Sequence, residues 1–243
     1  MHSWARGPFL GFDTETTGVD PRHDRIVTAA LVLRDARGTR QRTWLVDPRV
    51  EIPAAAADIH GVTTDHARAE GMHPRTALEE IATELAWAID AGIPVVVYNA
   101  CFDITLLEHE LVRWGLPTLA DRLGREPGPV LDPLVLDRAL DRYRSGKRKL
   151  VDLCRHYRVE AGDRLHTAEV DVLATLQVLD CLVATFPELG GRSLADLHDW
   201  QRECHREWAV GFNEWRVREG LPGIGADPEW LPPMRTAGVP LGV

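Results

Sequence analysis

Apolar and polar positions change their spacing along the chain, and the spacing predicts an order of strands and helices. The stretches 9–15, 25–33 and 39–46 are short and apolar with alternating polar positions, which is typical of strands. The turn residues Asp35 to Gly38 lie between the second and third stretches and predict a hairpin.

The middle of the chain predicts helices separated by one further strand. Apolar residues recur at helical spacing over 76–90, a continuous apolar run follows at 94–98, and 102–114 again has a helical pattern. Helices and strands that alternate after a three-stranded meander predict an α/β fold with a mixed sheet flanked by helices.

The last third predicts two long helices and an irregular end. The segment 170–186 is apolar nearly all round, which predicts a buried helix. Ser193 is a capping residue that opens a second helix, which Gly220 and Pro222 close. The apolar stripe of that helix, expected to pack on the domain or on a partner, consists of Leu197, Trp200, Cys204, Trp208, Phe212 and Trp215. Nine of the last 23 residues are Pro or Gly, so 221–243 is expected to be an irregular tail.

Composition narrows the class of protein. The start of the chain has no apolar signal segment and no run is long enough to span a bilayer, which predicts a cytoplasmic protein without membrane partners. The four cysteines form no C-x-x-C pair and are expected to be buried thiols. A net charge of −9 argues against a DNA-coating protein. Residues 138–158, however, hold eight basic side chains against two acidic ones, which suits either a phosphate backbone or a solvated helix face.

Asp13 and Glu15 lie two residues apart on the first strand, so their side chains project from the same face. Gly11 shares that face and leaves space beside them. Adjacent carboxylates repel each other, and a divalent cation can neutralise them. An exposed acidic strand end explains the same pair.

Asp103 follows the apolar strand and lies in the first turn of the next helix. The helix dipole favours an acid there, and Asn99 is a common capping residue, so both have a purely structural explanation. The position of Asp103 beyond the carboxyl end of a strand indicates a functional side chain instead.

His166 and Asp171 surround the start of the apolar helix, with Thr167 as the expected cap. Asp171 and Asp180 lie on opposite sides of this helix, so at least one of them faces the interior. A buried carboxylate needs a partner or a metal ion.

Together these segments resemble a known family. Residues 12–18, 99–103 and 166–171 are similar to the three motifs of the DEDDh 3′→5′ exonucleases, which include the proofreading ε subunits of bacterial DNA polymerase III, and 59–63 resembles a further loop of that family. The resemblance implies a ribonuclease-H-like exonuclease domain over 1–188, with a mixed five-stranded sheet. An amphipathic helix over 189–220 and the Pro/Gly-rich tail over 221–243 would follow it.

The family mechanism assigns a role to each acid. Asp13 would bridge two Mg²⁺ or Mn²⁺ ions, Glu15 and Asp171 would hold the first ion, and Asp103 would support the second. His166 would be the catalytic base that takes the proton from the attacking water. By the same resemblance, the residues that contact the terminal nucleotide would be Thr14, Thr16, His60, Asn99 and Phe102.

The expected activity is removal of nucleotides from the 3′ end of DNA, with single-stranded DNA as the main partner and a polymerase as a second one. Two alternatives stay open. The chain could trim RNA ends, since the motifs do not separate the two substrates, or it could be a non-catalytic subunit that binds a polymerase or nucleic acid. Mutually repelling carboxylates together with His166 argue against a subunit without catalysis.

Overall fold

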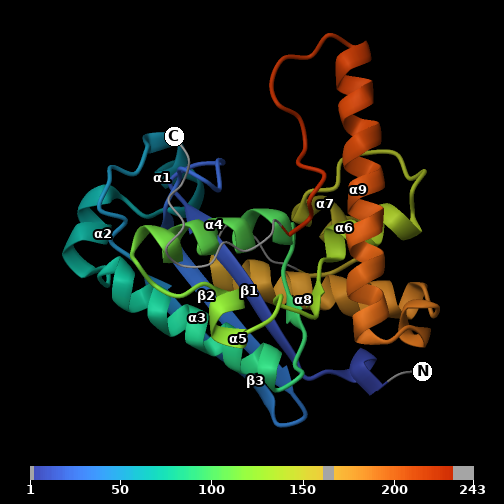
Figure 1. The fold of residues 1–243 in the computed structure, drawn as a ribbon, viewed down its shortest axis with the longest axis horizontal. Coiled ribbons are helices and arrows are strands. Elements are labelled where there is room, and N and C mark those ends of the chain that lie inside the picture. The colour runs from blue at the N-terminus through green and yellow to red at the C-terminus, as the bar shows by residue number, and fades with distance from the viewer. Residues whose placement is uncertain (1–2, 161–166, 232–243) are drawn as a thin grey trace.

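The computed structural model describes residues 3–160 and 167–231. Its centre is a five-stranded mixed sheet in the order β3-β2-β1-β4-β5 (Figure 1). β1 and β2 pair antiparallel, as do β2 and β3, whereas β1, β4 and β5 run parallel. The bounds of the strands are β1 Phe9–Thr16, β2 Ile26–Asp35, β3 Gly38–Leu45, β4 Val95–Val96 and β5 Val130–Leu131.

The α/β class and the mixed five-stranded sheet are therefore confirmed. The three-stranded meander lies where the apolar pattern predicts it, and Asp35 pairs with Gly38 across the predicted hairpin turn. β4 is shorter than the predicted run at 94–98. The two-residue β5 carries too little periodicity to be predicted by itself.

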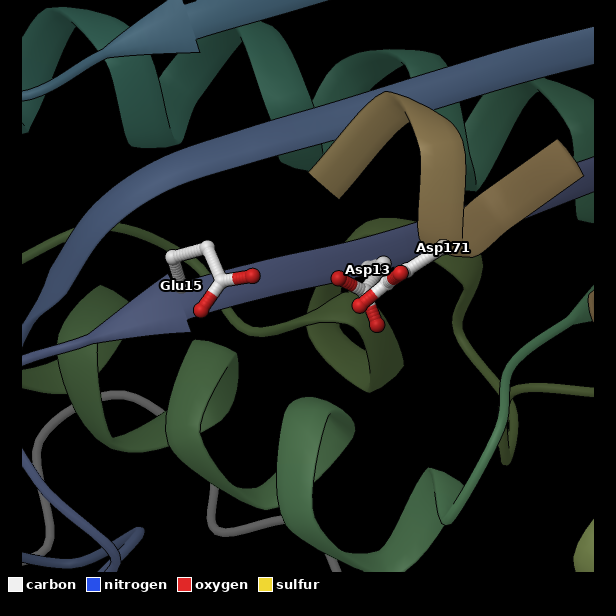
Figure 2. Close-up of side chains that lie close together, drawn as sticks. All are labelled: Asp13, Glu15 and Asp171. Atoms are coloured by element: carbon white, nitrogen blue, oxygen red, sulfur yellow. The ribbon is translucent and has the colours of Figure 1, made fainter. Parts of the chain in front are cut away.

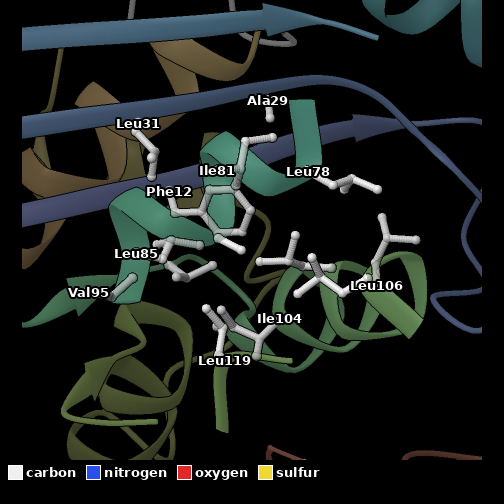
Figure 3. Packing of buried hydrophobic residues seen from close by; sticks show 14 of the residues in the cluster. Phe12, Ala29, Leu31, Leu78, Ile81, Leu85, Val95, Ile104, Leu106 and Leu119 are labelled. Atoms are coloured by element: carbon white, nitrogen blue, oxygen red, sulfur yellow. The ribbon is translucent and has the colours of Figure 1, made fainter. Parts of the chain in front are cut away.

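Helices cover one face of the sheet with an apolar layer. Phe12, Leu31 and Val95 point from the strands into this layer, where they meet Ile81 and Leu85 (Figure 3). The helices of this side are α3 Pro74–Asp90, α4 Ala100–Arg113 and the short α5 Leu119–Leu123. Because side chains alternate along a strand, the residues between those positions face the opposite layer.

The opposite face packs against α8, which is apolar nearly all round as its sequence predicts. Val32 and Val96 meet Val172, Leu176 and α8's other buried positions in this second layer. The helices on this side are α6 Pro133–Leu140, α7 Leu150–Tyr157 and α8 Ala168–Thr185. Two short helices, α1 Ala54–His60 and α2 Thr64–Glu70, follow β3, and the single turns η1 Ser3–Arg6 and η2 Leu189–Gly191 flank the domain.

The last helix, α9 Leu194–Arg218, begins at the predicted Ser193 cap, whose hydroxyl accepts a hydrogen bond from the Asp196 amide at 3.1 Å. In Figure 1 it stands beside α6 and α8, and its second half extends past the sheet and its flanking helices, with the returning segment next to it. The stripe prediction holds only for the first half. Leu197 is buried and Trp200 packs on the core, whereas Trp215 is 42% exposed.

The fully buried face of α9 lies beside the predicted stripe and contains polar side chains. His198 Nδ1 accepts the Val130 amide at 3.1 Å, and Gln201 Nε2 donates to the Val130 carbonyl at 3.0 Å. β5 is an edge strand, so its outer backbone groups need partners when they are covered. The polar face of α9 meets this need, which an apolar stripe could not do.

The described part of the tail, up to residue 231, is irregular as predicted, but it returns to the domain. Trp230 is completely buried among the residues of the first core layer. Asn213 holds the returning segment through two hydrogen bonds of 2.8 Å with the backbone of Ala226.

Two expectations from composition need correction. Cys154 is buried, but Cys101, Cys181 and Cys204 are only partly so, and all four are free thiols. In the basic segment, Arg144 and Arg148 turn inward and pair with the fully buried Asp137. These two arginines are structural, because a buried carboxylate requires charge partners.

Candidate active site

Gly11 lets α8 approach β1 closely beside the predicted acidic pair. A Cβ atom at Gly11 would lie 2.3 Å from Cγ1 of Val172, so a larger residue requires the Val172 side chain or the helix to shift. Val172 follows Asp171 in the chain, and the close approach therefore brings the first turn of α8 to the acidic end of β1. Gly11 lies on the same face of β1 as Asp13 and Glu15, as the sequence predicts. The small size of Gly11 allows α8 to pack closely on this face.

Three carboxylates meet where β1 and α8 approach. Oxygens of Asp13, Glu15 and Asp171 all lie within 4.8 Å of one another. Figure 2 shows Asp13 and Asp171 facing each other, with Glu15 farther along β1. On the far side of α8, Asp180 forms a bidentate ion pair with Arg34 at 2.6 and 2.7 Å. Of the two acids predicted to lie on opposite sides of this helix, Asp171 is the one directed at the site.

The electrostatics of this cluster are unfavourable for negative charge. The pKa of Glu15 is raised to about 7, mainly by burial and to a smaller extent by the negative charges of Asp171 and Asp103. Burial and the neighbouring carboxylates also raise the pKa of Asp13 well above its usual value. Carboxylates that gather despite such repulsion offer the hard oxygen ligands that divalent cations prefer. The donor set therefore fits a divalent metal ion.

Asp103 lies next to this cluster and is tied to β1. Its Oδ1 accepts hydrogen bonds from the Thr14 amide at 3.1 Å and from the Thr14 hydroxyl at 2.7 Å. Burial raises the pKa of Asp103 to about 7, although the bonds from Thr14 oppose the shift. These hydrogen bonds hold Asp103 beside Asp13 and occupy the Thr14 amide.

The predicted nucleotide contacts lie on three segments around the acids: the end of β1, the end of α1 and the start of α4. Asn99 adopts a left-handed conformation (φ 62°, ψ 49°) just before α4, without a capping bond from its side chain, and the partly buried Phe102 lies in the first turn. The Thr16 hydroxyl donates to the Gly18 carbonyl at 2.6 Å. Across from Thr16, His60 ends α1, and its buried Nε2 makes no hydrogen bond of ordinary geometry with the described residues. Burial lowers the pKa of His60, and the nearby Thr16 carbonyl opposes that shift.

The proposed base, His166, lies outside the described residues. The next residue, Thr167, is the N-cap of α8 as predicted, but its side chain makes no capping bond.

The structure also shows a buried polar residue near the site that is not among the predicted site residues. Asp132 is 1% exposed and accepts backbone hydrogen bonds from Asn99 at 3.0 Å and Ala100 at 2.9 Å. Its position before Pro133 at the start of a helix is a capping signal for α6. Nothing in the local sequence indicates that the same carboxylate also contacts α4, because that contact spans more than thirty residues.

Comparison with known proteins agrees with this geometry. A family model described as Exonuclease (RNase_T) matches residues 10–179, which include Asp13, Glu15, Asp103 and Asp171. The match ends before α9.

Relatives include polymerase-associated proteins. The chain is 29% identical over 170 residues to the DNA polymerase III subunit epsilon of Rickettsia conorii, covering 68% of this chain and 69% of that protein. It is 25% identical over 202 residues to the PolC-type DNA polymerase III of Mycoplasma pneumoniae, covering 82% of this chain but only 13% of that polymerase.

Solved structures share the fold. Exonuclease I of E. coli, in complex with a dT13 oligonucleotide, aligns with a TM-score of 0.63 at 20% identity over 75% of this chain and 42% of its own. Exonuclease X bound to 5′-overhanging duplex DNA aligns with a TM-score of 0.57 at 21% identity, covering 79% of this chain and 99% of that one. With a family model matching well over half of its residues, this chain belongs to the exonuclease family.

Proposed function

We propose that this protein is a metal-dependent 3′→5′ exonuclease that hydrolyses DNA from the 3′ end and releases nucleoside monophosphates. The observation that carries the proposal is the meeting of Asp13, Glu15 and Asp171 within 4.8 Å, in a chain of the exonuclease family. The ε subunit and exonuclease I among its relatives favour DNA as the substrate.

The acids divide into two groups in this proposal. Asp13, Glu15 and Asp171 would hold the first divalent ion, Mg²⁺ or Mn²⁺, and Asp13 with the Thr14-bound Asp103 would hold the second. When bound, such ions supply charge stabilisation for the phosphodiester and lower the pKa of an attacking water. Repulsion among the acids is relieved at the same time, which couples metal binding to stability.

The remaining residues act on the substrate. His166 would accept the proton of the attacking water in its neutral form. Phe102 would stack on or wedge against the terminal base, and Asn99, His60 and the backbone at Thr14 and Thr16 would contact its sugar and phosphate. His60 supports this role because its Nε2 is buried yet has no well-placed partner among the described residues.

The test uses 5′-labelled single-stranded DNA, duplex DNA and RNA of one sequence, with Mg²⁺ or Mn²⁺. We expect a ladder of products shortened from the 3′ end, release of mononucleotides, and complete inhibition by EDTA. Asp13→Asn is the matched inactive control, since it keeps the size of the side chain and removes its charge.

Other outcomes decide between the alternatives. Faster shortening of RNA than of DNA would make the chain an exoribonuclease. Binding of DNA without cleavage in the presence of Mg²⁺ or Mn²⁺ would indicate a non-catalytic subunit. Internal cuts would contradict an exonuclease of any kind.

A polymerase as a protein partner and a cytoplasmic location belong to the same proposal. Both rest on the relation to the ε subunit and PolC-type polymerases. No helix in the described parts of the chain is long and apolar enough to cross a membrane. Co-purification of the tagged protein with a polymerase from the soluble cell fraction would test partner and location together.

A further inference from the structure

The carboxylate of Asp132 joins the starts of two helices. As the N-cap of α6, it accepts hydrogen bonds through Oδ1 from the amides of Leu134 at 3.0 Å and Val135 at 3.4 Å. The same oxygen accepts the Asn99 amide at 3.0 Å, and Oδ2 accepts the Ala100 amide at 2.9 Å. One buried side chain thus satisfies backbone donors at the start of both α4 and α6, a role that normally needs a separate cap for each helix.

At α4 this support replaces the missing local cap. Asn99 stands at the capping position but in a left-handed conformation, and its side chain bonds to Cys101 Sγ rather than to a helix amide. Asp132 therefore adds negative charge at the start of α4, whose first turn also contains Asp103. The first turn that Asp132 supports carries Phe102 and Asp103.

The C-terminal part of the chain also contacts Asp132. Trp230 Nε1 donates to Asp132 Oδ2 at 3.2 Å, and the Asp132 amide donates to Gln201 Oε1 at 2.7 Å. Both contacts are buried, and they join positions 98 and 69 residues apart in sequence. Gln201 and Trp230 also lie beyond residues 10–179, the part of the chain that matches the exonuclease family.

Both residues are held so that they cannot easily leave Asp132. Gln201 Nε2 donates to the carbonyls of Val130 and Leu197 at 3.0 and 3.1 Å, which sets the orientation of its amide. The Trp230 ring is completely buried and lies 5.2 Å from the ring of His198, which itself binds the Val130 amide. A side chain that is held in one position also holds the group that it contacts in place.

We propose that Gln201 and Trp230 are positioning residues of the exonuclease reaction, which act through Asp132 to hold the start of α4 and with it Asp103, Asn99 and Phe102. The inference rests on the proposed function and adds to it that the active site is incomplete without α9 and the returning tail. A catalytic group must be held closely, and displacement by about 1 Å can cost on the order of 10²-fold in rate.

Two substitutions remove these bonds and leave an apolar side chain at the position. Trp230→Phe keeps an aromatic ring in the core but lacks the N–H donor, and Gln201→Met keeps the length of the side chain but can neither accept nor donate. Trp215→Phe is the control, since it makes the same chemical change on an exposed part of α9. Kinetics on single-stranded DNA and melting temperatures are measured for every variant, with rates taken well below each melting temperature.

We expect kcat to fall about tenfold or more in Trp230→Phe and Gln201→Met, and to stay unchanged in Trp215→Phe. A contact that only stabilises the fold would lower the melting temperature and leave kcat unchanged at low temperature. Asp132→Asn provides a double-mutant cycle: once Asp132 is replaced, Trp230→Phe should cause little further loss, because the two residues act through one hydrogen bond.

A spectroscopic measurement follows the same bond without turnover. The indole N–H signal of Trp230, assigned by its loss in Trp230→Phe, should shift when Mg²⁺ and thymidine monophosphate are added, because coupling between two sites is reciprocal. The Trp215 signal should not shift. If the wild type shortens DNA but both variants match its kcat and the Trp230 signal stays in place, the positioning role is wrong while the proposed function stands. A wild type that cuts no nucleic acid would overturn both.

Discussion

The carboxylates of Asp13, Glu15, Asp103 and Asp171 make the acidic site sensitive to protons and to cations. For Glu15 and Asp103, whose pKa values of about 7 exceed their ordinary values, the folded state binds more protons than the unfolded state between about pH 4 and 7. The stability that these two groups contribute is therefore present at low pH and is lost as the pH rises through 7. Cations bind the deprotonated form and act in the opposite direction.

This linkage predicts how the melting temperature depends on pH and metal. In EDTA, the wild type should lose stability from pH 5.5 to 8 relative to Glu15→Gln, which lacks one of the titrating groups. Mn²⁺ should raise the melting temperature of the wild type more at pH 8 than at pH 5.5. Thermal melts at both pH values test this, and equal pH profiles for the two proteins would contradict it.

The two aspartates of α8 allow a matched comparison. Asp171→Asn should lower the exonuclease rate by about 10²-fold or more, because it removes a charged ligand from the site. Asp180→Asn removes a surface ion pair with Arg34 and should cost about 1 kcal/mol or less, with the rate unchanged. Equal rates for the two variants would show that Asp171 is not part of the active site.

His166 is tested by separating catalysis from metal binding. His166→Ala should lose about 10²-fold or more in rate, yet keep the Mn²⁺-induced rise in melting temperature, because the histidine is proposed as a base and not as a ligand. In the wild type, the rate at saturating metal should rise with pH through one ionisation at about 6–8. Near-normal turnover of His166→Ala would show that another group accepts the proton.

At the scale of elements, the distance between β1 and α8 decides whether the site exists. Gly11→Ala would place a Cβ atom 2.3 Å from Cγ1 of Val172, and relief of this clash must move the Val172 side chain or α8, which carries Asp171. We expect a loss of about 1–3 kcal/mol in the free energy of unfolding. The rate and the Mn²⁺ stabilisation should fall in parallel.

Gly211→Ala is the control for that substitution. Its added Cβ has no neighbour within 4 Å, and Ala in a helix is favoured over Gly by about 1 kcal/mol. Gly211→Ala should therefore be slightly more stable than the wild type and fully active. If Gly11→Ala behaved in the same way, the close approach of α8 would not be required for the site.

At the scale of the whole molecule, α9 and the returning segment up to residue 231 pack on the domain that carries the site. A chain truncated after Pro187 would lose the buried Leu197 and Trp230 and would leave the Val130 amide and carbonyl without their partners on α9. Uncovered apolar surface and an open strand edge favour association. We expect this truncated protein to aggregate or to melt at a much lower temperature.

Size-exclusion chromatography and thermal melts check the truncation. A soluble, monomeric and fully active product would show that α9 serves a partner and not its own domain. The half-exposed aromatic end of α9 does not affect this test, because the buried residues of α9 lie between Leu197 and Ala209.

Much of the fold follows from the sequence because its determinants are local. Alternation along β1 places Gly11, Asp13 and Glu15 on one face whatever the rest of the chain does, and the apolar run at 170–186 requires a buried helix. Helical periodicity likewise places Asp171 and Asp180 on opposite sides of α8, so that one of them faces the interior. The order and spacing of the motifs indicate the exonuclease family. The family model that matches residues 10–179 confirms this prediction.

Contacts between distant segments were decided only by the tertiary structure. Asp103 bonds to Thr14, and Asp132 caps a helix that begins more than thirty residues earlier, because the parallel strands β1, β4 and β5 bring their carboxyl ends together. The inward face of α9 is polar and not the aromatic stripe, since an edge strand needs hydrogen-bond partners more than it needs apolar cover. Trp230 stands in a Pro/Gly-rich tail without periodicity. Its burial depends on contacts with residues that lie far away in the chain.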